Sequence, residues 1–79
     1  MTTLPHINPD NADRQQGAFV TVAAYAATKD GYDRNVERDL EGYITDLLAD
    51  LRHLCAARGF DFDKAVRVSL NHFEAELTE

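Results

Sequence analysis

The sequence has a single cysteine, Cys55, and no tryptophan among its 79 residues. One cysteine excludes an internal disulfide bond, and the Cys and His residues do not occur at the spacing of a zinc site. This usage is typical of a protein in a reducing, intracellular compartment, and we predict a cytoplasmic location.

Long apolar runs and targeting features are also missing. The first residues, MTTLPHINPDN, lack the basic start and apolar stretch of a secretory signal. The most apolar run, residues 18–27, is shorter than the roughly 20 residues that cross a bilayer. We therefore expect no insertion into a membrane.

Positive charge is scarce, with 8 Lys and Arg against 14 Asp and Glu and a net charge of −6. The basic residues are scattered and form no stripe that could neutralise phosphates, so direct binding of nucleic acid is not expected. An acidic surface suits a basic protein partner, drawn in by long-range attraction. The alternative is that the charge only keeps a small protein soluble.

The residues that are present predict an all-α fold, a three-helix bundle in a single domain. Hydrophobic residues make up 44% of the chain, enough for one core. We expect helices at about 9–29, 37–58 and 62–77, within a helical domain of residues 9–79 that follows a flexible N-terminal tail, 1–8. No segment alternates as a strand does. Because the connections are short, neighbouring helices are expected to run antiparallel.

Capping residues mark the helix ends. Asn8 and Pro9 are a typical start, Asp30-Gly31 and Gly59 are typical stops, and Asp61 is a natural cap for the last helix. Apolar residues recur at steps of three and four along the second helix and form one face, which we expect in the core: Leu40, Tyr43, Ile44, Leu47, Leu48, Leu51, Leu54 and Cys55. The expected inner face of the last helix is Val66, Ser69, Leu70, Phe73 and Leu77.

The first helix has an unusually wide apolar surface. Phe19 falls on one side of it, while Val22 and Tyr25 fall on another. Helices that are apolar around much of their girth are central or shared between subunits. These three residues are therefore candidates for self-association in a symmetric homodimer. Alternatively, the tail or the connection at 30–36, which includes Tyr32, covers them.

An acidic ridge follows one flank of the second helix, beside its leucines. Its members recur at steps of four and three: Asp39, Tyr43, Asp46, Asp50 and His53. Together with the nearby Glu41, this flank is the candidate surface for a basic partner. The alternatives are a solvated flank and a divalent cation held through carboxylate oxygens.

Nucleophilic and general-base chemistry find little support. His53 and His72 could approach each other across antiparallel helices, but such flank histidines are usually boundary residues. Ser69 has no base or oxyanion-hole turn beside it. Cys55 lies on the leucine face with no cation nearby, which predicts packing in the core.

Residues 46–66 read DLLADLRHLCAARGFDFDKAV. This segment resembles the helix-turn-helix passage of MazG-like nucleotide pyrophosphohydrolases, which implies a helical, usually oligomeric fold and magnesium-dependent cleavage of nucleoside triphosphates. Asp50 matches the Asp of the family's Glu-x-x-Asp motif, but Leu47 stands at the Glu position and Asp46 lies one residue before it. In size, charge and helical content the chain is also similar to small acidic phage and mobile-element proteins, anti-CRISPR proteins among them.

These features predict a non-catalytic, acidic protein-binding module with no cofactor and no metal. Its sharpest form is an inhibitor that covers a basic groove of a nucleic-acid-binding complex. Two alternatives stay open. One is a degenerate MazG-like pyrophosphohydrolase with a metal on Asp46 and Asp50, and the other is a structural accessory subunit that docks through its first helix.

Overall fold

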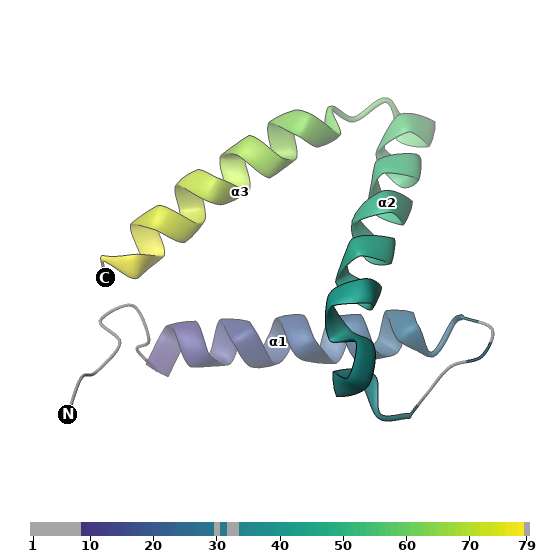
Figure 1. Ribbon diagram of the computed structural model, residues 1–79. Coiled ribbons are helices and arrows are strands. Elements are labelled where there is room, and N and C mark those ends of the chain that lie inside the picture. The colour runs from purple at the N-terminus through teal and green to yellow at the C-terminus, as the bar shows by residue number, and fades with distance from the viewer. Residues whose placement is uncertain (1–8, 30, 32–33, 79) are drawn as a thin grey trace.

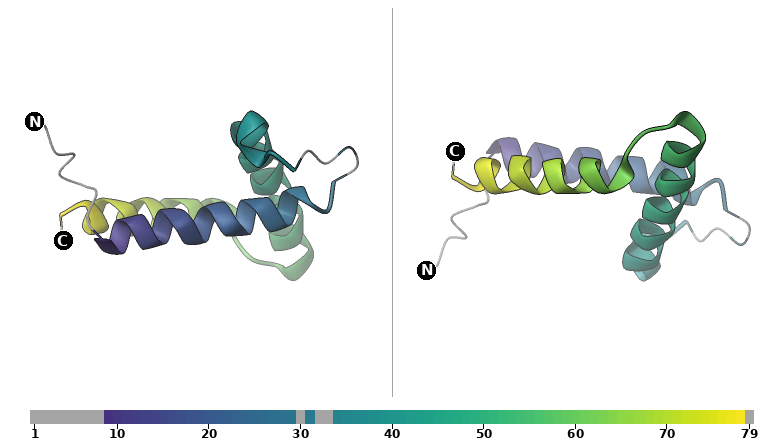
Figure 2. Two further views of the ribbon diagram at one scale, coloured as in Figure 1. Left: turned by 90° about the horizontal axis from the view of Figure 1, so that it is seen from below. Right: turned by 90° about the horizontal axis from the view of Figure 1, so that it is seen from above.

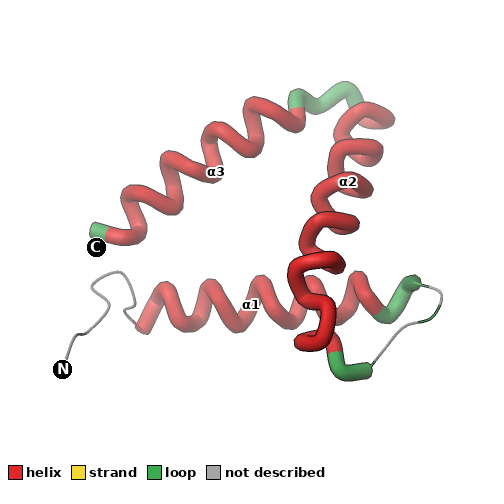
Figure 3. Tube along the Cα trace, viewed as in Figure 1, coloured by secondary structure: helices red, strands yellow, loops and turns green. Residues whose placement is uncertain are grey.

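The computed structural model describes residues 9–29, 31 and 34–78, and it has three long helices joined by short connections (Figures 1 and 3). In chain order the elements are α1 (Pro9–Ala26), a 3-10 turn η1 (Val36–Asp39), α2 (Leu40–Arg58) and α3 (Phe62–Leu77). No strand occurs within the described ranges, and the predicted all-α, three-helix fold is confirmed. The expected tail, 1–8, lies outside them.

The predicted helix ends at Gly59 and Asp61 are confirmed. Gly59 has a φ of 72°, a left-handed conformation that favours glycine. The next amide, of Phe60, donates to the carbonyl of Cys55 at 2.9 Å and closes the last turn of α2. The Asp61 carboxylate accepts a hydrogen bond from the Lys64 amide at 2.9 Å and caps α3. The sharp corner between α2 and α3 follows from these two signals.

Gly31 has a φ of 73° and lies in the connection after α1, as its position predicts. The α-helix itself ends at Ala26, and a tight turn follows in which the Lys29 amide donates to the carbonyl of Ala26. Asp30, expected to end this helix, and Tyr32 lie outside the described residues.

The buried core lies where the C-terminal half of α1 crosses the N-terminal half of α2. Its buried hydrophobic residues are Val22, Ala26 and Val36. The side chains packed against them are Phe19, Ala23, Leu40, Tyr43 and Leu47. Val36 shows that the connection supplies a core residue as well as joining the helices.

The helices form the three sides of an open triangle (Figure 1). The prediction that neighbouring helices run antiparallel is wrong for α1 and α2, which cross steeply and pack through residues 19–26 and 40–47. From the far end of α2, α3 returns toward the start of α1, so the C-terminal end of α3 lies near the N-terminal end of α1 (Figures 1 and 2). The Cα atoms span 42 × 33 × 15 Å, and the thin dimension is about that of two helices packed across each other, with axes roughly 8–10 Å apart.

A further structural finding concerns membranes. Among the described residues, no helix is both long enough and apolar enough to cross one.

Candidate interaction surface

Large apolar side chains of α2 and α3 are exposed along the inside of the triangle. Ile44 lines a hollow that α1 closes with Ala18 and Phe19. Phe73 lines another cavity, against the start of α1. Helical periodicity places the neighbours three, four and seven residues away on the same sides. We call this set the inner face: Ile44, Leu48 and Leu51 of α2 with Val66, Leu70 and Phe73 of α3.

Exposure of the inner face contradicts the expectation that these residues form the core of a closely packed bundle. Their exposed fractions run from 38% for Leu51 to 55% for Phe73. The steep crossing is the reason, because α1 covers α2 only around Leu40, Tyr43 and Leu47. Beyond Leu47, the side chain of Asp50 makes polar contacts with the end of α1 and the turn that follows it, and Leu48 and Leu51 stay exposed. Cys55, also expected in the core, is only partly buried.

The α2–α3 corner has apolar and polar contacts of its own. Leu54 is 50% exposed and Phe60 is 66% exposed, so the apolar surface continues into the corner. The Arg52 guanidinium stacks over the Phe62 ring at 4.5 Å and pairs with the Asp63 carboxylate at 3.1 Å. These contacts join the end of α2 to the first turn of α3, at the corner between the two halves of the inner face.

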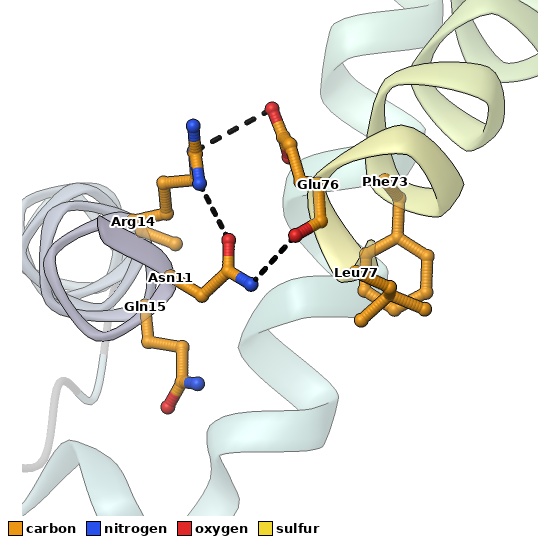
Figure 4. Close-up of a pocket in the computed structure, with 7 residues that line it drawn as sticks. Asn11, Arg14, Gln15, Phe73, Glu76 and Leu77 are labelled. Atoms are coloured by element: carbon orange, nitrogen blue, oxygen red, sulfur yellow. Dashed lines mark hydrogen bonds and ion pairs between the residues drawn. The ribbon is translucent and has the colours of Figure 1, made fainter. Parts of the chain in front are cut away.

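A polar bridge closes the opposite corner, between α1 and the end of α3 (Figure 4). Asn11 is buried, and its side-chain amide donates to the Glu76 carbonyl at 3.0 Å. Arg14 donates to the Asn11 side-chain oxygen at 2.5 Å and pairs with the Glu76 carboxylate at 3.5 Å. The bridge satisfies one of the carbonyls that a helix end leaves without a partner. A cavity of about 260 Å³ lies beside it, lined also by Phe73 and Leu77.

The predicted acidic ridge is only partly open to a partner. Asp39, Asp46 and His53 are exposed, whereas Tyr43 packs against the core. Asp50 accepts hydrogen bonds from the Tyr25 hydroxyl and, at 3.0 Å, from the Lys29 ammonium group. It therefore ties α2 to α1.

Charge and hydrogen bonding shift the titration of this cluster. The hydrogen bonds from Tyr25 and then from Lys29 hold the pKa of Asp50 below its usual range. Partial burial and the bond to Asp50 raise the pKa of the Tyr25 hydroxyl. Hydrogen bonding to Tyr25 and Asp50 raises the pKa of Lys29, whose ammonium also lies 4.6 Å from the centre of the Tyr25 ring. All three shifts follow from contacts that hold the helix crossing together.

Glu41 does not share the flank of the acidic ridge. It precedes Asp46 by five residues, which places the two side chains about 140° apart around the helix. Asp39 folds over the first turn of α2, where a side chain on Gly42 would meet its carboxylate. Within the described part of the chain, Asp39, Glu41 and Asp46 form no ion pair, so their charge faces water on two flanks of α2.

The candidates for self-association on α1 all face α2. Val22 is 7% exposed and Phe19 packs against it. Tyr25 is partly buried and bonds to Asp50. Phe19 and Val22 were expected on different sides of α1, yet both pack in the cluster that Val36 of the connection joins. The burial of Val22 within one chain favours the alternative that the connection covers this side of α1.

The arrangement of the described side chains supports neither metal binding nor a contact between the two histidines. Within 9–29, 31 and 34–78, no group of three or more His, Cys, Asp or Glu residues is placed to hold a metal ion. His53 and His72 are both exposed, on helices that diverge from their shared corner (Figure 1). The alternative metal pair, Asp46 and Asp50, would require Asp50 to give up Lys29.

The structural roles of two residues, Val36 and Asn11, are not indicated by the sequence. Val36 is a lone apolar residue four positions before Leu40, and that spacing is the only feature of the sequence that indicates its burial. Asn11 resembles any polar residue of a first turn, and nothing in the sequence indicates its bond to Glu76. The pair Tyr25 and Lys29 does carry a signal, since residues four apart are neighbours on a helix.

Comparisons of the chain with protein-family models, with curated proteins and with solved structures found no match. The resemblance of residues 46–66 to MazG-like pyrophosphohydrolases therefore stays a prediction from the sequence. The same holds for the similarity in character to anti-CRISPR proteins. The proposed function therefore rests on the contacts and exposure of the described residues.

Proposed function

We propose that the protein is a non-catalytic association module that binds other protein surfaces through its inner face. The observation that carries this proposal is the exposure of the six inner-face side chains along two helices. Single exposed apolar residues are normal, but contiguous apolar patches on monomeric proteins are rare and mark interaction sites. Here the patch lines the inside of the triangle and is held in shape at its corners.

The free energy involved is large for so small a chain. Complete burial of a Leu, Ile, Val or Phe side chain stabilises by about 1.5–3 kcal/mol. With roughly half of that burial unrealised, six side chains leave on the order of 6 kcal/mol available. Whole domains have free energies of unfolding of about 5–15 kcal/mol. The gross free energy that a partner gains by covering the inner face is thus comparable with the stability of a small domain, before the entropy cost of association is subtracted.

Affinity capture with matched baits tests the proposal. The baits are the wild-type protein, Leu70→Glu on the inner face, and Val68→Glu on the opposite side of α3, where the side chain is 37% exposed. We expect Leu70→Glu to lose the partner and Val68→Glu to keep it, with unchanged helix content by circular dichroism in both. Equal binding by all three baits would reject the inner face as the binding surface.

A second candidate function uses the charge. Asp39, Glu41 and Asp46 are exposed carboxylates on a chain of net charge −6, which suits a basic protein surface. The sharpest form of this hypothesis is inhibition of a nucleic-acid-binding complex by an acidic, cytoplasmic protein of phage or mobile-element character. Capture that weakens with salt and is lost on Asp39→Lys with Asp46→Lys supports it. Capture unchanged by both treatments rejects it.

A further inference from the structure

We propose that the occupant of the inner face is a second copy of this chain, in a symmetric homodimer in which α2 of each copy packs against α3 of the other. This inference rests on the proposed function and names its partner. It moves self-association from Phe19, Val22 and Tyr25, which the crossing covers, to α2 and α3.

The first argument is the open shape of the chain. A helix buries its apolar stripe only against another element, and the leucines of α2 beyond Leu47 are exposed, as are Val66, Leu70 and Phe73 of α3. The Cα radius of gyration is 14.9 Å, against about 12 Å for a compact chain of this length. An identical chain supplies the helices that these stripes lack, because α3 of one copy can cover α2 of the other.

The second argument is area. The chain exposes 6374 Å², whereas a compact protein of its mass exposes roughly 4,800 Å². The excess is about 1,600 Å². This total also counts the residues outside the described ranges. Each partner in a stable interface buries roughly 800 Å², so half of the excess is enough for one. A second copy has the same excess of exposed surface, so one contact between the copies buries it on both chains.

The third argument is the distribution of charge. None of the six inner-face residues is charged, so the face does not select a charged partner. Asp46 lies on a different side of α2 from Leu48, because side chains two residues apart on a helix point about 160° away from each other. The exposed carboxylate therefore stays in water when the inner faces meet. In a two-fold contact α2 of each copy can pack on α3 of the other, which pairs apolar residues on both sides.

Sedimentation equilibrium over a wide range of protein concentration, from micromolar to millimolar, tests the dimer. We expect the wild-type protein and Val68→Glu to have about twice the chain mass of 8.9 kDa, and Leu48→Glu and Leu70→Glu to be monomers. A wild-type monomer at every concentration overturns the inference. So does a dimer that Val68→Glu dissociates and Leu70→Glu does not, because it would use another face.

A second measurement needs no variant. In a mixture of isotope-labelled and unlabelled wild-type protein, nuclear Overhauser effects between copies should connect inner-face methyl groups with the Phe73 ring. Effects between copies that involve only other surfaces would contradict the proposed contact. If the wild type is a monomer but Leu70→Glu still loses a different captured protein, the association module stands and only the self-association is wrong.

Discussion

Val22→Ala should destabilise the protein far more than Val20→Ala, although the two valines are neighbours on one helix. Val22 is 7% exposed in the core, whereas Val20 is 56% exposed. Removing two buried carbon groups costs about 1.6 kcal/mol, and the cavity left behind adds to this. Alanine is the better helix former by roughly 0.5 kcal/mol, which offsets part of the loss. We expect a net loss of about 1–2 kcal/mol at Val22 and a change near zero at Val20.

Thermal unfolding followed by circular dichroism measures the difference. A change of 1 kcal/mol shifts Tm by roughly 4–8 °C in a domain of this size, so Val22→Ala should melt about 5–15 °C below the wild type. Val20→Ala should melt within about 3 °C of it. Equal melting temperatures for the two variants, at several protein concentrations, would refute the placement of the core at the crossing of α1 and α2.

Two further predictions concern single contacts. The depressed pKa of Asp50 means that its contribution to stability is present above its ordinary pKa of about 3.9 and is lost as the pH falls through the lower, folded value. Asp50→Asn should therefore lower Tm at pH 7, and a pH series of melting curves should show this effect shrinking progressively as the pH falls below about 4. Asp46→Asn, which removes no ion pair of the described residues, should leave Tm at pH 7 near that of the wild type. Asp61→Ala removes the cap of α3 and should cost about 1 kcal/mol with a loss of helix content, whereas Asp61→Asn keeps a capping side chain and should cost much less, so equal costs for the two variants would speak against the cap.

Helix positions were predictable because their signals are local. Gly59 and Asp61 act within a few residues of chain, through backbone conformation and one side-chain hydrogen bond. The bounds of α3, Phe62–Leu77, match the prediction of 62–77, and α2 begins three residues later than predicted because η1 precedes it. The predicted start of α1 at residue 9 is also confirmed. None of these features depends on what another helix does.

The relative placement of the helices was not predictable in the same way. A stripe of leucines indicates which side of α2 is apolar, but not whether another helix covers it along its whole length. Here α1 covers the stripe near Leu47 and leaves Leu51 exposed. The acidic ridge illustrates the same limit, because Asp50 has the spacing of its neighbours and yet bonds to Tyr25 and Lys29. Contacts across large sequence separations decide both cases.

Self-association would also explain how α3 is stabilised. An isolated helix of 16 residues is marginal in water, and most helical stability in proteins comes from packing of an apolar face. Within the chain α3 is held at its two ends, by the Arg52 contacts and by the Asn11 bridge, while Leu70 between them is 54% exposed. The contacts at the ends set where α3 lies, and burial of its middle by a second copy would add packing that the chain alone does not supply. Tm is therefore expected to rise with protein concentration for the wild type and to be independent of concentration for Leu70→Glu.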